Sequence, residues 1–409
     1  MCSEAGNSNG RRDDKRHGES IMKRDAICPV FGKCGGCLMQ DIDYSAQLQI
    51  KKNSILLDFE LKKIRLDPAM RIFCKDEYYY RNRMDFPFSF DGPGQRQKGR
   101  FDKIVNFEKC YIANGGVNAV FEEVSAWFRD KKGEIDVFDV VKRTGTIRYA
   151  TIRSAYFSGE SSVTFIFNSD SERLEEQKEL IRVFAAAAKV KNVLLGFVKY
   201  NTDQSTVENA EIIKGNDILY EELGPRRFYF HTQGFFQSNS PVLLDIMYFV
   251  REKLGGSCGT LVDLYGGVGT LGISLMDQAE RVYVVDNSRL NSICGKKNIE
   301  FNKGDNVRIF EADAEKSGEL GLELDPANSV FLLDPPRNGI HRKVLSYIKS
   351  AGPAKLIYVS CNPSKQAQDI AALLEDYELV DFAAFDMFPQ TKHVETVAVL
   401  VKKEGKLSL

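Results

Sequence analysis

The sequence predicts an α/β protein in which a β-rich region precedes a doubly wound, mainly parallel sheet. From about residue 70 to 230, short apolar or alternating runs are divided by turn residues, which is typical of β structure. After Pro241, apolar strands alternate regularly with helical stretches. A chain of 409 residues is also too long for one ordinary core. We therefore expect a flexible tail over 1–27, a β-rich domain over 28–230 and an α/β domain over 231–409.

Composition narrows the class of protein. Hydrophobic residues make up 43% of the chain and charged residues 28%, which fits a globular protein. The formal net charge of −1 neither requires nor excludes a nucleic-acid partner, so any such site would be a local patch. We find no run of about 18 uncharged apolar residues, and the N-terminus is charged where a signal peptide is apolar. We expect a cytoplasmic protein with no membrane contact and no obligate protein partner.

Short signals mark the elements that precede the α/β region. The polar, charged tail includes Met22, a second candidate for the first residue. The Gly- and Cys-rich residues 28–40 indicate a metal-binding loop. A helix near 43–64, which could pack on the α/β domain, should follow with lysines on its outer faces. Antiparallel strands are expected beyond it, with helices around 114–130 and 171–188. The apolar face of the first helix would hold Tyr44, Leu48, Ile55 and Phe59.

Seven strands are predicted in the C-terminal half, and helical segments separate the first six. A short loop joins the last two, so the seventh strand should run antiparallel to its neighbours. Ligands of a doubly wound sheet sit at the carboxyl edge of its strands. The predicted strands are Leu261–Leu264, Val282–Val285, Val307–Phe310, Val330–Leu333, Leu356–Val359, Glu378–Phe385 and Thr396–Leu400.

The first of these strands runs into a glycine-rich turn, Leu261-Val-Asp-Leu-Tyr-Gly-Gly-Val-Gly-Thr270. Asp286 ends the next strand, where a carboxylate can accept both hydroxyls of a ribose. The glycine spacing is neither the dinucleotide fingerprint nor a phosphate-binding P-loop, and it suits S-adenosylmethionine better. Asp313, past the third strand, is placed to meet an adenine amine. The alternatives are a plain tight turn and solvated turn acids.

Three further polar segments belong at the same edge of the sheet: Asp334-Pro-Pro-Arg-Asn-Gly339, Ser360-Cys-Asn-Pro363 and His393-Val-Glu395. In the usual order of such sheets the seventh strand neighbours the fifth, so Cys361 and Glu395 would face each other. A thiol beside a carboxylate suits carbon methylation of a pyrimidine, in which a thiolate adds to C6, C5 takes a methyl group and a base removes the C5 proton. The alternatives are a small buried cysteine and an exposed acid.

These segments resemble one family closely, the S-adenosylmethionine-dependent RNA 5-methyluridine methyltransferases of tRNA and 23S rRNA. The resemblance covers nearly all of the chain after residue 27, and it implies a Rossmann-like methyltransferase sheet preceded by a β-rich domain. The residues that carry it are CPVFGKCGGCLMQ (28–40), YRNRMDF (80–86), FFQSN (235–239), DLYGGVGT (263–270), DPPRNGI (334–340), YVSCNPSKQAQDI (358–370) and DMFPQTKHVET (386–396).

The resemblance also implies roles for individual residues. Cys361 would be the nucleophile and Glu395 the proton acceptor, and Asp334 would also touch the substrate uracil. Two positions depart from the family pattern. Gly266 stands where the family usually has cysteine, and Asp286 stands where it often has the longer glutamate. The positions that fall where the family binds S-adenosylmethionine are Gln237, Tyr265, Thr270, Asp286, Asp313 and Asp334.

Four cysteines, Cys28, Cys34, Cys37 and Cys110, supply soft metal ligands. Their spacing fits zinc and an iron–sulfur cluster about equally, with unliganded thiols as the third interpretation. The resemblance favours a 4Fe-4S cluster, which an iron–sulfur branch of the family carries and which would pin the N-terminal loop to the β region. Because no room exists before Cys28 for the extra RNA-binding barrel of many relatives, the chain is similar to the shorter branch.

Structured RNA is the expected partner. A basic aromatic patch beside the catalytic cleft would bind its phosphates and unstacked bases, and a solvated sheet face is the alternative. The expected reaction is methylation of uridine C5 in 23S rRNA or tRNA through a cysteine–C6 adduct. RNA base N-methylation competes with it but leaves Cys361 and Glu395 without a task, and both residues argue against a non-catalytic iron–sulfur RNA-binding protein. The patch would comprise Arg81, Arg83, Arg96, Lys98, Arg100 and Lys103 with Tyr78–Tyr80, Phe86 and Phe101.

Overall fold

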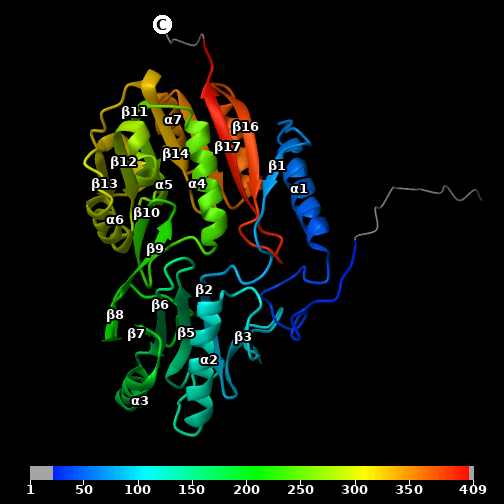
Figure 1. Ribbon diagram of the computed structural model, residues 1–409, viewed down its shortest axis with the longest axis vertical. Helices are drawn as coiled ribbons and strands as arrows, with labels where there is room; N and C mark the ends of the chain where they lie inside the picture. Colours follow the sequence, from blue (N-terminus) through cyan, green and yellow to red (C-terminus); the bar gives the residue numbers. More distant parts are fainter. Residues whose placement is uncertain (1–21, 405–409) are drawn as a thin grey trace, which may run out of the picture.

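The computed structural model describes residues 22–404, which form two large β-sheets and a two-stranded hairpin, with helices packed against them (Figure 1). Residues 1–21 of the predicted tail over 1–27 lie outside the described residues. Its last part, residues 22–27, is not a free tail, because Lys23 forms a bridge with Ile42 and Arg24 forms an ion pair with Glu77. No helix among the described residues is both long and apolar enough to cross a membrane.

Eight strands form the C-terminal sheet: β1 (Arg71–Phe73), β11 (Cys258–Leu264), β12 (Ala279–Asp286), β13 (Val307–Glu311), β14 (Ser329–Leu333), β15 (Lys355–Ser360), β16 (Tyr377–Phe385) and β17 (Glu395–Lys402). Their order is β1-β16-β17-β15-β14-β11-β12-β13. β17 runs antiparallel to both of its neighbours, β15 and β16, and the other pairs are parallel. The predicted count of seven was one short, because β1 from the N-terminal half pairs with β16 at the edge.

Helices and a hairpin bury both faces of this sheet. One apolar cluster includes Phe228, Val250 and Leu261, and the other, on alternate residues of the same strands, includes Phe59 and Val262. Because both faces are buried, the strands are nearly continuous apolar runs. The covering elements are α1 (Tyr44–Glu60), α4 (Ser240–Leu254), α5 (Thr270–Ser274), α6 (Arg289–Phe301), α7 (Arg342–Ala351), α8 (Pro363–Leu373) and the hairpin of β9 (Ile218–Leu223) and β10 (Arg226–His231), with 3-10 turns at Met276–Gln278, Ala314–Glu319 and Pro326–Asn328.

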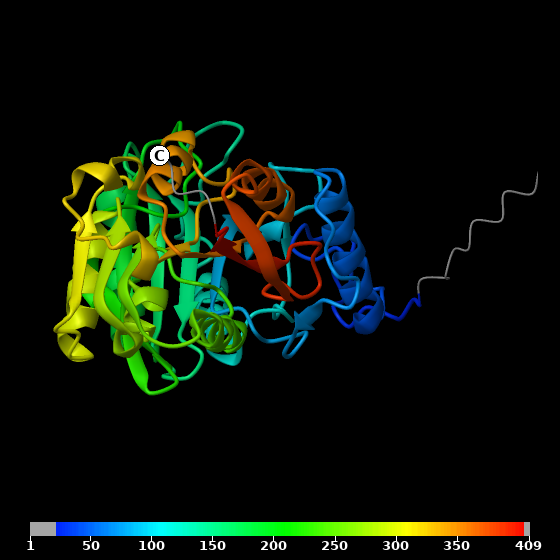
Figure 2. The same cartoon turned by 90° about the horizontal axis from the view of Figure 1, so that it is seen from above.

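Helix α1 lies beside the strands β16 and β17, where Figure 2 shows it in blue next to the red strands. The predicted apolar face of this helix was wrong in its first half, because Tyr44 and Leu48 are only partly buried. A lysine enters the core instead of staying on the outer faces, since a carboxylate in the β16–β17 connection compensates its charge. The buried stripe, spaced four residues apart, is Gln47, Lys51, Ile55 and Phe59.

The second sheet has seven strands: β2 (Arg83–Ser89), β3 (Gly92–Arg96), β4 (Ile104–Asn106), β5 (Ile147–Ser154), β6 (Ser161–Asn168), β7 (Asn192–Val198) and β8 (Ala210–Lys214). They lie in the order β4-β3-β2-β5-β6-β7-β8. The expectation of an all-antiparallel region was wrong, because β6 and β7 pair in parallel. The intervening helix α3 (Leu174–Ala187) makes this crossover, and it packs with α2 (Gly115–Asp130) over the aromatic core of the sheet. Both helices were predicted.

Candidate active site

The end of β15 and the start of β17 bring two predicted site residues to one edge of the sheet. Ser360 pairs with Thr396 across the two strands, and the Thr396 hydroxyl donates to the Ser360 carbonyl at 3.1 Å. Cys361 follows Ser360 directly, and Glu395 precedes Thr396. Asn362 donates from Nδ2 to the carbonyl oxygen of Arg337 at 2.9 Å, which ties the loop after β14 to the same edge.

Two acids at this edge are held in surroundings that favour their neutral forms. The Glu395 side chain is buried, and its Oε2 has no hydrogen-bond partner among the described residues. Burial, and then the neighbouring Asp334, raise the pKa of Glu395 well above its usual value, while Arg337 opposes the shift. Burial also raises the pKa of Asp334 to about 7. A hydrogen bond of 3.3 Å from Gln237 Nε2 to Asp334 Oδ2 lowers this pKa but does not cancel the effect of burial. In the part of the chain that the structure describes, the strand edge therefore holds a buried carboxyl oxygen, Oε2 of Glu395, that has no hydrogen-bond partner.

Cys361 lies within the field of both acids. Burial raises its pKa to about 11, with further contributions from Glu395 and then Asp334, and Arg337 lowers it. At neutral pH this thiol is protonated in the free protein, so any nucleophilic role needs a proton acceptor when substrate binds. Arg337 is the cation that favours the thiolate. Sequence reasoning gave Arg337 no role at this site, although its place in the Asp334-Pro-Pro-Arg337 segment after β14 was a usable signal.

The glycine loop between β11 and α5 is fixed by two carboxylates. Gly267 has a positive φ of 58°, and its N–H donates to Asp286 Oδ2 at 3.0 Å. Gly272 N–H donates to Asp263 Oδ2 at 2.8 Å. At Gly266 an added Cβ would come within 2.8 Å of the Asp263 carboxylate, so a larger residue here would have to displace that side chain. The loop is thus preformed by its own neighbours.

The residues predicted to bind S-adenosylmethionine lie around this loop, but they differ in burial and in their hydrogen bonds. The hydroxyl of Tyr265 and Oδ1 of Asp263 are buried without a hydrogen-bond partner among residues 22–404, which fits a site that receives a polar ligand. Thr270 begins α5 beside them. Asp286 already accepts from Ser288 N and Asn291 Nδ2 as well as from the glycine loop.

Asp313 is the outlier among these residues. Its side chain is exposed, and its Oδ1 accepts from Asn287 Nδ2 at 3.1 Å beyond the ends of β12 and β13. The geometry leaves this acid at the rim of the loop and does not bring it into the buried part.

The four predicted metal ligands lie close enough to influence one another. Burial raises the pKa of Cys37 to about 12, and the charges of Cys110, Cys34 and Cys28 add to the shift. Burial likewise raises the pKa of Cys110. Within residues 22–404, however, no three His, Cys, Asp or Glu side chains are arranged to hold a metal ion. The donor chemistry fits a metal, whereas the arrangement is not a formed metal centre.

The predicted basic aromatic patch is only partly a surface. Tyr80 and Phe86 are buried and belong to the interior, which corrects their assignment to the patch. Phe101 is exposed, as are Lys98 and Lys103. Several of the arginines are paired with carboxylates, at distances of 3.0 Å for Arg83–Asp85, 2.9 Å for Arg96–Asp203 and 2.8 Å for Arg100–Asp102.

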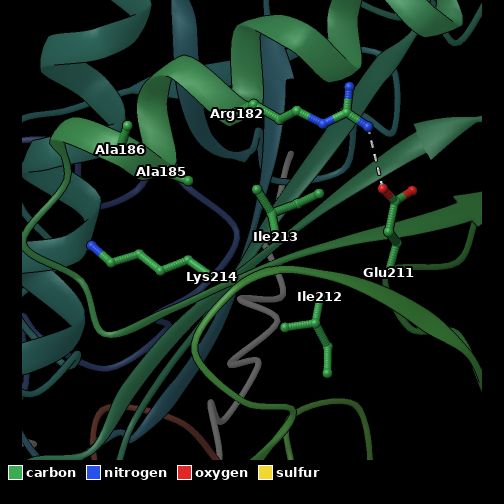
Figure 3. A pocket seen from close by; sticks show the side chains of 7 residues that line it. All are labelled: Arg182, Ala185, Ala186, Glu211, Ile212, Ile213 and Lys214. Carbon is green, nitrogen blue, oxygen red and sulfur yellow. Dashed lines mark ion pairs between the residues drawn. The ribbon is translucent and has the colours of Figure 1, made fainter.

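A surface hollow elsewhere holds none of the predicted residues. It lies between α3 and the edge strand β8, where Arg182 pairs with Glu211 at 3.5 Å (Figure 3). Its other lining residues are apolar apart from Lys214. This hollow belongs to the seven-stranded sheet and is separate from the carboxyl edge of the other sheet.

Comparisons with known proteins agree on one class of enzyme. A family model described as tRNA (uracil-5-)-methyltransferase matches residues 43–404. The tRNA (uracil(54)-C(5))-methyltransferase of Pyrococcus horikoshii is 31% identical over 386 residues, which cover 93% of this chain and 87% of that protein. An uncharacterised RNA methyltransferase of Clostridium tetani is also 31% identical, over 93% of this chain and 85% of its own length.

One solved structure is similar over most of its length. It is the tRNA (uracil-54, C5)-methyltransferase of Pyrococcus abyssi in complex with S-adenosyl-L-homocysteine. It superposes with a TM-score of 0.73 at 26% identity, and the match covers 90% of this chain and 86% of that one. The α/β fold of a methyltransferase is therefore shared.

Proposed function

Because this chain belongs to the tRNA (uracil-5-)-methyltransferase family, we propose that it transfers a methyl group from S-adenosylmethionine to C5 of a uridine in RNA. The observation that carries the proposal is the meeting of Cys361 and Glu395 at the edge that also holds the glycine loop. The two Pyrococcus relatives are named as methyltransferases of uracil 54 in tRNA, which makes tRNA the first substrate to assay.

The two side chains divide the chemistry between them. The thiolate of Cys361 adds to C6 of the uracil, and the electron pair of the C5–C6 double bond then makes C5 nucleophilic. S-adenosylmethionine supplies the methyl group that C5 takes. Glu395 removes the C5 proton, the C5–H electrons restore the C5–C6 double bond, and the sulfur leaves as thiolate. Arg337 favours that thiolate, since it lowers the pKa of Cys361.

The buried carboxyl groups also suit this sequence of proton transfers. Burial raises the pKa of Asp334 to about 7, and Glu395 beside it is raised as well, so the pair can take up one proton near neutral pH. Asp334 and Gln237 are joined by a hydrogen bond and lie between the glycine loop and Glu395. We assign them to orienting the methyl donor and the uracil.

S-adenosylmethionine would be held by the residues around the glycine loop. Tyr265 and Asp263 offer unpartnered buried oxygens, and Asp286 and Thr270 flank the turn. Asp286 Oδ1 already accepts two hydrogen bonds and Oδ2 accepts one, so Oδ2 keeps a lone pair for a ribose hydroxyl, while the present bonds fix the direction of the carboxylate. Asp313 would meet the adenine only at the exposed rim.

The cysteine loop is proposed to carry a 4Fe-4S cluster on Cys28, Cys34, Cys37 and Cys110. What supports this is the set of four neighbouring thiols without another chemical task. The cluster would link the loop over 28–40 to the segment before α2. Iron and acid-labile sulfide at four equivalents each in anaerobically purified protein would support the assignment, and one equivalent of zinc would replace it.

The RNA would be bound by the N-terminal part of the protein, which includes the seven-stranded sheet. We propose that residues 28–230 bind RNA and that 231–409 carry out methylation, with α1 attached to the second unit. The exposed Phe101, Lys98 and Lys103 offer a stacking surface and charges for phosphates. A uridine must leave its stack to reach Cys361, because C5 chemistry requires access to the ring face.

Two substitutions test the reaction at its first and last steps. Cys361→Ala should abolish 5-methyluridine formation and give no covalent RNA adduct, because the ring is never activated. Glu395→Gln should slow turnover by about a hundredfold or more and accumulate a methylated enzyme–RNA adduct, because elimination lacks its base. Intact-mass measurement after denaturing electrophoresis separates the two outcomes. A Cys361→Ala protein that still makes 5-methyluridine at the normal rate would overturn the mechanism.

A further inference from the structure

The connection between β16 and β17, residues 386–394, is held by distant parts of the chain. A loop carbonyl usually bonds water or its own segment, but four consecutive carbonyls here accept from other elements. Met387 accepts from Asn239 Nδ2 (3.1 Å), Phe388 from Lys51 Nζ (3.1 Å), Pro389 from the Tyr80 hydroxyl (2.9 Å) and Gln390 from the N–H groups of Leu38 and Met39 (2.9 and 3.2 Å). All of these donors except Asn239 come from residues 38–80.

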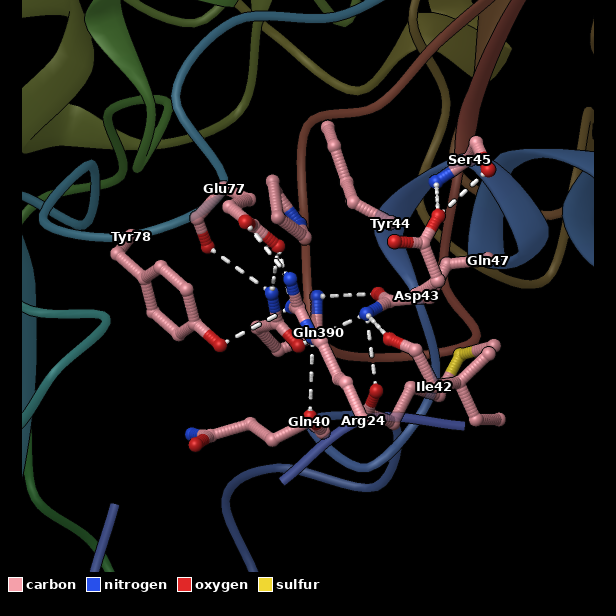
Figure 4. Close-up of polar contacts among 12 residues, drawn as sticks. Arg24, Gln40, Ile42, Asp43, Tyr44, Ser45, Gln47, Glu77, Tyr78 and Gln390 are labelled. Carbon is pink, nitrogen blue, oxygen red and sulfur yellow. Dashed lines mark hydrogen bonds and ion pairs between the residues drawn. The ribbon is translucent and has the colours of Figure 1, made fainter. Parts of the chain in front are cut away.

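Gln390 is the most constrained residue of the connection. It is fully buried and has a positive φ of 66°, a conformation that non-glycine residues adopt only when their surroundings hold it. Gln47 on α1 supplies that hold through a reciprocal pair (Figure 4). Gln47 Nε2 donates to Gln390 Oε1 at 2.9 Å, and Gln390 N donates to Gln47 Oε1 at 3.2 Å. Gln390 Nε2 donates to Glu77 Oε2 at 2.8 Å, so both ends of its amide are used.

The same contacts reach back to the cysteine loop. Glu77 forms an ion pair with Arg24, whose Nε donates to the Gln40 carbonyl at 3.2 Å (Figure 4). Gln47 Nε2 also donates to the Met39 carbonyl at 2.9 Å. The end of the loop over 28–40, the start of α1 and the β16–β17 connection thus form one polar network, which is fully buried at Gln47 and Gln390 and partly exposed at Arg24 and Glu77. Its last member along the chain, Gln390, lies five residues before Glu395.

We infer that Gln47 and Gln390 are positioning residues for Glu395, so that the N-terminal segment completes the catalytic site. This inference rests on the proposed function, because it assigns Glu395 to proton removal. A base must lie within hydrogen-bond reach of the proton it takes, and a displacement of about 1 Å can cost a hundredfold in rate. Without the Gln47 pair, Oε1 and the backbone N–H of Gln390 lose their partners while Nε2 keeps Glu77, and the connection shifts to regain the lost bonds.

The test compares Gln47→Ala with Gln49→Ala. Gln49 lies on the exposed face of the same helix, where its Nε2 donates to Asn53 at 2.7 Å, so it serves as a matched control. Gln47→Ala should lower kcat by about tenfold or more while KM for RNA and S-adenosylmethionine stays within about twofold. The fraction of enzyme covalently linked to RNA should rise, because methyl transfer precedes the step that uses Glu395. Gln49→Ala should match the natural protein.

A second variant keeps the test decisive if Gln47→Ala does not fold. Tyr80→Phe removes only the hydroxyl that donates to Pro389 and keeps the buried ring, so it should show the same rise in adduct with a smaller fall in kcat. The inference is overturned if the folded variants turn over normally, or if kcat falls without any rise in adduct. Failure of the natural protein to trap RNA containing 5-fluorouridine would instead overturn the proposed function.

Discussion

At the scale of single residues, the surroundings of Cys361, the proposed nucleophile, disfavour its reactive thiolate form. Burial and the carboxyl groups of Glu395 and Asp334 all favour the neutral thiol of Cys361, and Arg337 alone among these neighbours favours the thiolate. In the proposed mechanism, a thiolate formed only when uracil is in place would react with its substrate and not with other electrophiles. Glu395, the proposed base for the C5 proton, would therefore also keep the free enzyme unreactive.

This balance predicts the reactivity of Cys361 towards iodoacetamide. In the free protein, alkylation should follow the thiolate population with a pKa of about 11. Glu395→Gln removes a negative neighbour and so lowers that pKa, which should speed alkylation at pH 9 between about two- and tenfold, since one pKa unit is a tenfold change in thiolate. Arg337→Met should slow it. Peptide mapping by mass spectrometry isolates Cys361 from the other cysteines, and an unchanged or slower rate in Glu395→Gln would contradict the assigned electrostatics.

At the scale of elements, apolar periodicity predicted most of the helices and strands. It failed where buried polar pairs determine which face of an element is buried. The seven C-terminal strands and the helices α2 and α3 follow from patterns within their own segments. β1 was missed because three residues carry no pattern, and its partner β16 lies about 300 positions away. The buried face of α1 was misplaced because Gln47 and Lys51 read as surface residues until Gln390 and Asp386 are known to face them.

The parallel pairing of β6 with β7 was also missed because it leaves no pattern within the strands themselves. Strand direction depends on the crossover through α3, and the alternation of apolar residues within each strand does not record it. Motif spacing predicted that Cys361 and Glu395 share one edge, because Cys361 follows the end of β15 and Glu395 begins the antiparallel β17. Arg337 and Gln390 act through three-dimensional neighbours and left only their place in a motif as a signal.

The buried pair Lys51–Asp386 gives a prediction for α1. Lys51 Nζ lies 2.5 Å from Asp386 Oδ1, and both side chains are fully buried. Lys51→Met leaves a buried acid that keeps hydrogen bonds from the Tyr44 hydroxyl, at 2.9 Å, and from the Phe388 backbone but loses its counter-charge, so the free energy of unfolding should fall by roughly 3–5 kcal/mol. Urea unfolding measures the change. Adding Asp386→Asn should recover part of the loss, and Lys52→Met on the same helix should change it by less than about 1 kcal/mol; equal losses in Lys51→Met and Lys52→Met would contradict the role of the pair.

At the scale of the whole molecule, the C-terminal sheet is not built from C-terminal residues alone. Strand β1 extends its edge, α1 covers β16, and the hairpin β9–β10 packs against α6. The β16–β17 connection is held by residues 38–80. The unit that is proposed to bind the methyl donor is therefore completed by segments that precede it in the chain, and the two halves of the protein should fold together.

The expected consequence is that residues 231–409 do not fold on their own. The fragment would expose the apolar surface that six earlier side chains bury in the intact protein: Ile55, Phe59, Leu219, Leu223, Phe228 and Phe230. Burying one such side chain contributes about 1.5–3 kcal/mol, so the six together are comparable with the roughly 5–15 kcal/mol that stabilise a whole domain. The fragment should therefore aggregate or lack the near-ultraviolet circular dichroism of fixed aromatic packing, and it should not bind S-adenosylmethionine in calorimetry.

The full chain is the control and should unfold in urea in one cooperative transition. A soluble 231–409 fragment with native circular dichroism and cofactor affinity would show that the C-terminal sheet is autonomous, and that α1, β1 and the hairpin are accessories to it.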